Sequence, residues 1–329
     1  MPLTRINTTT GTATPDELGC TLIHEHVMVG YPGWELDAKA PRFKRADAMS
    51  RALDQMQELK DHGLGTFVDP CPMDLGRDVE FLAELSQKSG MRIVCTTGAY
   101  FEAQGNTFTF KQVPLEEITE IYIKEIEDGI GDTGIHAGAI KIATGHRVVS
   151  EYEQKLVIAA ARAAKATGAP IISHTEGATC GHDQIDLVTG EGVPVDQLLV
   201  GHSDGTTDQW YQRALAERGA YVGFDRFGIE MFQPDDVRIK GILNLVNHGH
   251  LERVMMSHDS IMCWLGRPLP YAQTFAGLLE MLPKWRSTHI FREIVPKLKA
   301  AGLSQAQIDT ILVDNPRRLF ARGLGGGCC

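Results

Sequence analysis

The sequence contains no long apolar run, no dense basic stretch and no CxxC pair. Its first residues, MPLTRINTTTGTATPDEL, include no apolar segment, so we expect neither a secretory signal nor a membrane span. A net charge of −10, with lysines and arginines scattered along the chain, argues against a nucleic-acid partner. The seven cysteines are odd in number and fit a reducing compartment better than a disulfide framework, which favours the cytoplasm.

The composition is otherwise that of an ordinary globular protein, with 43% hydrophobic and 22% charged residues. Although 329 residues would suffice for two domains, no linker or low-complexity segment divides the chain. We therefore expect one domain over residues 1–329. Its last residues, 323–329, end in Gly-Gly-Gly-Cys-Cys and are expected to form a disordered tail.

Short β-branched runs alternate with longer amphipathic segments along the chain. This alternation predicts parallel strands joined by crossover helices, which is the α/β class. No GxGxxG follows the first run, so an open dinucleotide-binding sheet is not indicated, and eight runs favour a closed (β/α)8 TIM barrel. The strands are expected at residues 21–26, 66–69, 92–97, 138–143, 170–174, 198–202, 220–224 and 253–258.

The segments between these runs have helical patterns. Three of them, residues 46–63, 77–90 and 151–168, end in glycine, the residue type that favours a left-handed helix C-cap. Further helices are expected at about residues 270–320, beyond the last strand. They should either close the bottom of the barrel or pack beside it.

Side chains able to bind metal ions stand at the ends of five predicted strands. The first run ends in His24-Glu25-His26, and histidines two positions apart on a strand face the same side. The carboxyl ends of barrel strands meet at one mouth, where active sites lie. The side chains that should converge there are His24, His26, Lys141, His174, His202 and Asp259.

The structural alternative must be weighed for each of these residues. A single histidine at a strand end is more often a hydrogen-bonded core residue than a ligand, so histidines elsewhere in the chain are assigned no function. A lysine at the end of an apolar strand, however, needs a specific partner, because burying its charge costs several kcal/mol. Five strands would each have to place a metal-competent group at the same level independently. As a set, these residues predict a metal site.

Taken in order, the motifs resemble those of the amidohydrolase superfamily and, within it, the phosphotriesterase family. The resemblance extends over roughly residues 8–322. HxH alone would be a weak signal, but the ordered set is specific. The matching segments are TLIHEHVMVGYPG, TFVDP, RDVEFLAELSQKSGMRIVCTTGAY, IKIATG, ISHTEG, VGHSDG, GFDRFG, SHDS and DNPRRLF.

This resemblance implies a binuclear centre with two divalent metal ions. The histidine pair of the first strand and Asp259 correspond to ligands of the buried ion, and His174 and His202 to ligands of the more exposed one. Lys141 corresponds to a lysine that CO2 converts to a carbamate, which bridges both ions. Imidazole and carboxylate ligands suit zinc, which we expect first, and also cobalt, manganese and iron.

The implied mechanism is hydrolysis by a hydroxide that bridges the two ions. Two cations lower the pKa of a shared water toward about 7, so that hydroxide forms near neutral pH. The more exposed ion polarises the acceptor oxygen of the substrate and stabilises the charge that develops there. Asp259 is the catalytic candidate, as the proton acceptor that later helps the leaving group to depart.

Two residues near the predicted mouth are candidates for substrate binding. Tyr100 follows the third strand, with rim packing as its alternative. Arg226 follows the seventh and could bind substrate, form an ion pair with Asp225, or do both, and the mixed role is favoured. The Asp225-Arg226 pair resembles phosphotriesterase-like lactonases, because dedicated phosphotriesterases of the family have histidine after that aspartate. The apolar segment 261–282 predicts either a lid for an acyl chain or a helix packed over the barrel.

We therefore expect a hydrolase of small lactones such as N-acyl-homoserine lactones, a quorum-quenching activity, with side activity on phosphotriesters. Both reactions develop charge on one oxygen of the attacked group, which makes overlap expected. A dedicated organophosphate phosphotriesterase is the nearest alternative, followed by a carboxylic ester or amide hydrolase. A metal-holding binding protein is the non-enzymatic alternative. The resemblance also implies a homodimer, formed through apolar faces near the mouth.

Overall fold

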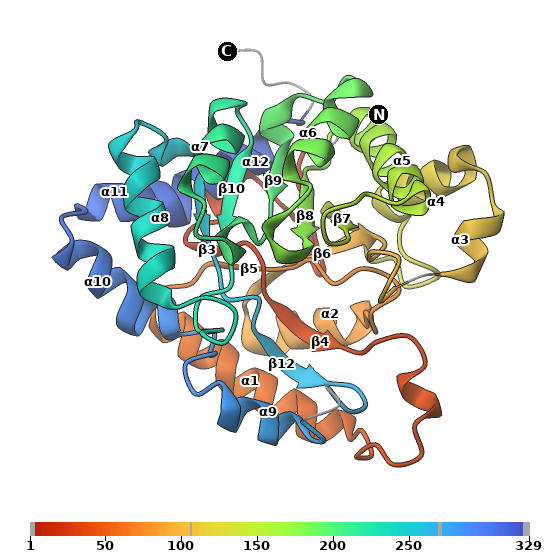
Figure 1. The fold of residues 1–329 in the computed structure, drawn as a ribbon. Coiled ribbons are helices and arrows are strands. Elements are labelled where there is room, and N and C mark those ends of the chain that lie inside the picture. The colour runs from red at the N-terminus through yellow and green to blue at the C-terminus, as the bar shows by residue number, and fades with distance from the viewer. Residues whose placement is uncertain (1–3, 106, 269–271, 325–329) are drawn as a thin grey trace.

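Eight parallel strands form an almost closed barrel in the computed structural model, which describes residues 4–105, 107–268 and 272–324 (Figure 1). Each strand pairs in parallel with the next one in the sequence order β3-β5-β6-β7-β8-β9-β10-β11. The predicted (β/α)8 TIM barrel is confirmed. The strands are β3 (Thr21–Leu22), β5 (Thr66–Asp69), β6 (Arg92–Gly98), β7 (Ala139–Thr144), β8 (Ile171–Thr175), β9 (Leu198–Val200), β10 (Tyr221–Phe224) and β11 (Val254–Met256).

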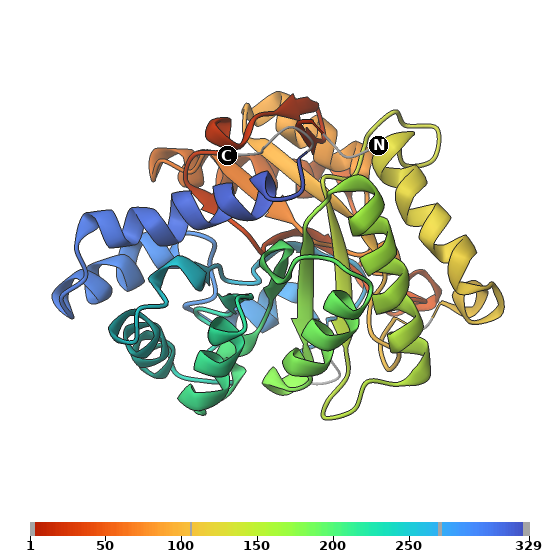
Figure 2. The same cartoon turned by 90° about the horizontal axis from the view of Figure 1, so that it is seen from above.

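Helices cover the outside of this barrel (Figures 1 and 2). The three helices predicted to end in glycine are α1, α2 and α5, and Gly63, Gly90 and Gly168 have φ angles of 84°, 69° and 78°. A left-handed residue cannot continue a helix, so each glycine ends its helix as expected. The helices between strands are α1 (Arg45–Asp61), α2 (Val79–Ser89), α3 (Phe108–Gln112), α4 (Leu115–Glu127), α5 (Glu151–Thr167), α6 (Gly181–Gly190), α7 (Gln209–Glu217) and α8 (Asp235–Asn247).

A layer of apolar side chains fills the barrel interior below the mouth. Each barrel strand, or the residue that directly follows it, contributes one member: Ile23, Val68, Val94, Ala139, Ile172, Leu199, Tyr221 and Met255. Leu319 and Phe320 of α12 (Asn315–Ala321) and Ile6 of the β1–β2 hairpin (Ile6–Thr8 and Gly11–Ala13) pack against this layer. The C-terminal helix, drawn in blue, therefore closes the bottom of the barrel beside the N-terminal segment, as predicted (Figure 2).

The other predicted C-terminal helices pack beside the barrel. They are α9 (Phe275–Met281), α10 (Val295–Ala300) and α11 (Gln305–Asp309). Leu298 of α10 and Ile308 of α11 join the outer core, whereas Leu278 of α9 packs on Trp285 in a separate cluster.

The first and last barrel strands meet without a ladder between them among the described residues. Instead, the Asp259 N–H donates to the His24 carbonyl at 3.0 Å, and the His24 N–H donates to Ser257 Oγ at 2.9 Å. We call this junction between β3 and β11 the seam of the barrel. Beyond it, β4 (His26–Val29) pairs in parallel with β12 (Ile261–Trp264). The continuous strands predicted at 21–26 and 253–258 are therefore wrong in detail, because the chain bends at Ile23 and His24 and leaves the strand after Met256.

The described part of the chain contains no helix long and apolar enough to cross a lipid bilayer. Of the predicted disordered tail, residues 325–329 lie outside the described residues. Leu324 packs against the apolar layer inside the barrel.

Candidate metal centre

The six predicted site residues come together at the carboxyl end of the barrel. Asp259 lies at their centre: its Oδ1 is 3.2 Å from His26 Nε2 and 3.8 Å from His24 Nε2, and its Oδ2 is 3.7 Å from His202 Nε2. Lys141 Nζ lies 2.8 Å from His24 Nε2. The His174 and His202 rings are 4.5 Å apart between centroids, which adds His174 to the cluster.

The pleat of the strands explains this convergence. Ala139 and Ile172 belong to the apolar layer inside the barrel, and Lys141 and His174 follow them by two residues. Side chains two apart on a strand share a face, so both polar groups point inward, one layer nearer the mouth. His202 and Asp259 lie just past their strands with positive φ angles of 56° and 53°. Such strain in non-glycine residues is typical of functional sites.

Carboxylates orient three of the four imidazoles through Nδ1. His24 and His202 donate Nδ1–H to the two oxygens of Asp225, at 3.0 and 2.8 Å. His26 donates to Asp69 at 3.0 Å. Because a carboxylate only accepts hydrogen bonds, each Nδ1 holds a proton. In the neutral rings of His24 and His202, Nε2 then keeps a lone pair directed at the cluster. This arrangement is usual for histidines that bind metals.

His174 has the opposite orientation. Its Nε2–H donates to Glu176 Oε2 at 2.9 Å, and its Nδ1 accepts from the Tyr100 hydroxyl at 3.2 Å. Nδ1 is therefore the atom of His174 available as a ligand.

Burial holds three of these imidazoles in the neutral form that metal ions require. It lowers the pKa of His24, lowers that of His202 well below its usual value, and lowers that of His174 to about 4. His26 differs. Burial opposes its charge, but hydrogen bonds to Asp259 and Asp69 outweigh burial and raise the pKa of His26 well above normal.

The lysine and the central carboxylate respond to the same environment. Burial lowers the pKa of Lys141 to about 8, and the side chain is 2% exposed. Its one recorded hydrogen bond to a described residue is to His24, so an ammonium there would have no anion in contact. Burial alone would raise the pKa of Asp259, but the imidazoles of His202 and His26 and the Arg226 guanidinium hold it well below normal.

This donor set fits divalent metal ions. Three neutral imidazoles, a fourth imidazole on His26, a carboxylate and a readily deprotonated lysine offer the nitrogen and oxygen ligands that zinc and its neighbours take. His24, His202 and Asp259 each offer an atom within 4.8 Å of the others.

A second group with similar spacing, His26, Asp69 and Cys71, is occupied by internal hydrogen bonds instead. The Asp69 carboxylate accepts from His26 and from two backbone N–H groups, those of Val27 and Cys71. Burial raises the pKa of the Cys71 thiol, so this sulfur is a poor ligand.

Arg226 contacts the cluster at Asp259. Its Nε donates to Asp259 Oδ2 at 3.1 Å, and its guanidinium lies 5.5 Å from the centre of the Phe232 ring. The alternative ion pair with Asp225 is therefore wrong, because His24 and His202 take that carboxylate. The side chain is 13% exposed, and its terminal Nη atoms have no recorded hydrogen bond to a described residue.

Sequence reasoning missed the carboxylates that orient the imidazoles, namely Asp69, Asp225 and Glu176. General chemistry could have indicated part of this, because metal-binding histidines almost always donate a hydrogen bond from their second ring nitrogen to a group such as a carboxylate. Asp225 and Glu176 also follow strands directly. Which carboxylate reaches which histidine depends on the closed barrel.

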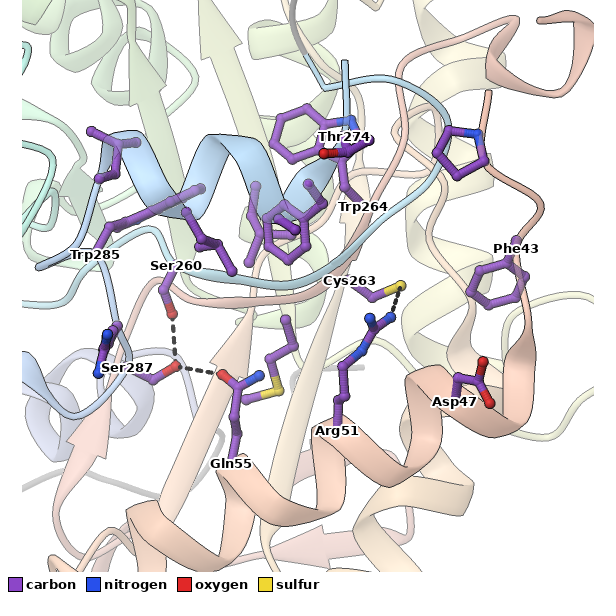
Figure 3. A pocket seen from close by; sticks show the side chains of 18 of the residues that line it. Phe43, Asp47, Arg51, Gln55, Ser260, Cys263, Trp264, Thr274, Trp285 and Ser287 are labelled. Carbon is purple, nitrogen blue, oxygen red and sulfur yellow. Dashed lines mark hydrogen bonds between the residues drawn. The ribbon is translucent and has the colours of Figure 1, made fainter. Parts of the chain in front are cut away.

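A cavity of about 800 Å³ lies away from this cluster, between α1 and α9 (Figure 3). None of the six candidate ligands lines it. The predicted lid segment 261–282 forms one wall, through β12 and α9, and residues 269–271 of that segment lie outside the described residues. Trp264 lines this cavity, and its ring centroid lies 6.3 Å from that of Phe275 and 5.8 Å from that of Tyr31.

Comparisons with known proteins show which family the chain resembles. The family model described as "Phosphotriesterase family" matches residues 4–320. An organophosphorus hydrolase from Deinococcus radiodurans superposes with a TM-score of 0.92 at 37% identity, over 97% of each chain. A mutant PTE-like lactonase from the same organism gives 0.90 at 36% identity, over 96% of this chain and 99% of that one. An aryldialkylphosphatase from Saccharolobus solfataricus is 32% identical over 93% of this chain and 96% of its own.

Proposed function

The chain belongs to the phosphotriesterase family of metal-dependent hydrolases, and from that premise we propose that it is a binuclear lactonase. Its substrates would be lactones such as N-acyl-homoserine lactones, with slower turnover of phosphotriesters. The observation that carries this proposal is the six-donor cluster with Arg226 bound to its central carboxylate at 3.1 Å.

In this proposal, one metal ion is held by the histidine pair His24 and His26 with Asp259, and a second by His174 and His202. Lys141, as a carbamate, would supply anionic oxygen ligands to this centre. When bound, two such ions lower the pKa of a shared water and polarise the oxygen of the substrate. The low pKa of the Lys141 amine, about 8, supports the carbamate, because CO2 adds to a neutral amine.

The residues around the cluster supply positioning and proton transfer. Asp259, ionised and 16% exposed, would accept the proton of the attacking water and then deliver it to the leaving oxygen. Arg226 would hold Asp259 through Nε and donate from Nη to the oxygen where charge develops. Tyr100, with its hydroxyl beside His174, would form the opposite wall.

A lactone with an apolar substituent suits the surface around the mouth. The large apolar side chains that are exposed among the described residues lie on connections at the carboxyl side of the strands or, for Trp210, in the first turn of α7. They are Leu36, Phe108, Val148, Trp210, Met231, Phe232, Leu279 and Met281. Such a rim favours an acyl chain over a charged substrate. The lactonase among the structural relatives supports this choice.

The test is a side-by-side kinetic assay of purified, metal-loaded protein. Aliphatic lactones of graded chain length are compared with dialkyl aryl phosphotriesters, aryl esters and simple amides. We expect kcat/KM for lactones to exceed that for triesters by about 100-fold, which is about 2.7 kcal/mol of transition-state preference. The reverse ratio would make the protein a dedicated organophosphate hydrolase, and a preference for esters or amides would indicate the third candidate.

Asp259→Asn separates an enzyme from a metal-holding binding protein. A hydrolase should lose most of its turnover while its thermal melting curve stays cooperative, because the side chain keeps its size. A binding protein would show no turnover to lose.

We also propose a homodimer formed through the apolar rim. Light scattering on the eluting chromatographic peak would report twice the 36.1 kDa chain mass, and a single-chain mass would contradict it.

A further inference from the structure

Glu25, the middle residue of the HEH motif, takes no part in the metal cluster and is 0% exposed. Its two carboxylate oxygens accept four hydrogen bonds from the segment between β11 and β12. Oε1 accepts from the His258 backbone N–H at 2.8 Å and from His258 Nδ1–H at 2.6 Å. Oε2 accepts from the Ser260 backbone N–H at 3.0 Å and from the Ser260 hydroxyl at 2.5 Å. Glu25 therefore holds both neighbours of Asp259.

Asp259 needs this support because its backbone is strained. Its φ angle of 53° lies in the left-handed region, which a residue with a β-carbon adopts only when its surroundings impose it. The barrel seam is also located here, and in the described residues it has no strand ladder. Beyond the bonds from Glu25, two backbone hydrogen bonds cross the seam here: the Asp259 N–H donates to the His24 carbonyl at 3.0 Å, and the His26 N–H donates to the Ser260 carbonyl at 2.7 Å.

The hydrogen bonds of Glu25 continue away from the cluster. His258 Nε2 accepts from the Ile290 backbone N–H at 2.9 Å, so both nitrogens of this imidazole are engaged. Ser260 Oγ is 2.9 Å from Ser287 Oγ, which in turn lies 3.4 Å from Gln55 Oε1 on the wall of the α1–α9 cavity (Figure 3). The carboxylate thus lies inside a satisfied network, with its acceptor sites committed to the residues around Asp259.

We propose that Glu25 is a positioning residue for metal binding: it fixes the backbone on both sides of Asp259 and so sets where that carboxylate points. Glutamine cannot replace it. Each glutamate oxygen accepts two donors, so the amide nitrogen of Glu25→Gln would face either the His258 pair or the Ser260 pair. One side of Asp259 would lose its support. This inference rests on the proposed role of Asp259 as a metal ligand.

The experiment titrates metal-free protein with Co²⁺ and follows its visible d–d absorption, which reports ligand geometry independently of turnover. Relative to wild type, we expect Glu25→Gln to weaken Co²⁺ binding by about tenfold to 100-fold and to change the d–d band shape. Glu153→Gln is the matched control. Glu153 is also a buried carboxylate that accepts backbone N–H groups, those of Gly145, Ser150 and Glu102, and it contacts none of the candidate ligands.

A role limited to folding would lower the melting temperature of both variants and leave their Co²⁺ spectra and affinities like those of wild type, which would overturn the proposal. If Glu25→Gln does not fold, two neighbouring serines provide the test. Ser260→Ala removes one bond to Glu25 and should weaken Co²⁺ binding about threefold. Ser287→Ala leaves that bond in place and should bind like wild type. Equal affinities of the two serine variants would refute the proposal.

Failure of this inference can be told apart from failure of the proposed function. If wild type does not bind Co²⁺, or if Asp259→Asn binds it as tightly as wild type, the metal role of Asp259 is wrong. If Asp259→Asn weakens binding and Glu25→Gln does not, only the positioning role is wrong.

Discussion

Replacing Asp225 with asparagine tests whether the orientation of two imidazoles depends on one carboxylate. Oδ1 of Asp225 accepts both the backbone N–H and the Nδ1–H of His202 at 2.8 Å, whereas Oδ2 accepts His24 Nδ1–H at 3.0 Å. Asparagine offers one oxygen. With that oxygen at the Oδ1 position, its amide nitrogen faces His24, which must move its proton to Nε2 to accept the new donor. The lone pair that points into the cluster is then lost.

The magnitude follows from the bond that is lost. A hydrogen bond to a charged group contributes about 1.5–3 kcal/mol. If the wild-type tautomer of His24 becomes less favourable by that amount, the affinity for the metal bound by His24 falls by roughly 10- to 150-fold. Turnover at limiting metal should fall in parallel, while saturating metal restores part of it.

The assay is a competitive titration of metal-free protein with Zn²⁺ against a chromophoric chelator. Asp204→Asn is the control, because Asp204 is an equally buried carboxylate two residues after His202 that bonds to Arg238 and the Arg226 backbone instead. Affinity of Asp225→Asn within twofold of wild type would refute the reasoning. So would an equal loss in both variants.

Three further outcomes are expected. Reconstitution of the metal-free protein with metal ions should be faster when bicarbonate is added, and faster at pH 9 than at pH 7. With a pKa of about 8, the neutral fraction of Lys141 rises from about one tenth to about nine tenths over this range. Lys141→Met should be inactive and insensitive to bicarbonate. The folded-state pKa of His174 is lowered from 6.5 to about 4, so protons bind the unfolded state first as pH falls, and His174 by itself should cost the metal-free protein about 2 kcal/mol of stability between pH 7 and pH 5. Urea unfolding at both pH values measures this loss, and an unchanged pH dependence in His174→Asn would contradict it. Gly98→Ala should destabilise the protein by more than about 3 kcal/mol and lower its melting temperature, because the new β-carbon would lie 2.0 Å from the Lys141 carbonyl oxygen. Gly249→Ala, also at positive φ but with no atom within 4 Å of its β-carbon, should cost far less stability.

The sequence predicted the barrel and the convergence of the six candidate ligands because both depend on local order. Lys141 and His174 each follow an apolar strand residue by two positions, and the pleat then fixes their direction. The family resemblance supplied the ligand roles, which spacing alone could not.

What could not be predicted depends on contacts between distant strands. Asp225 sits beside Arg226 in the sequence, and an ion pair between neighbours was a reasonable alternative, but barrel closure brings His24, 201 positions away, to that carboxylate. The early end of strand β3 at Leu22 also depends on tertiary structure. Residues 23–25 continue the run predicted as a strand, but their backbone bends so that the His24 carbonyl accepts the Asp259 N–H.

The seam between β3 and β11 has a consequence for how the chain folds. Its partners, His24 and Asp259, are separated by most of the sequence, so joining them closes the largest loop in the barrel and is expected late, after the neighbouring strands have paired. A ligand that binds residues on both sides of the seam would then stabilise the last-formed contact rather than the folding nucleus. Its main kinetic effect would be slower unfolding, with little change in the rate of folding.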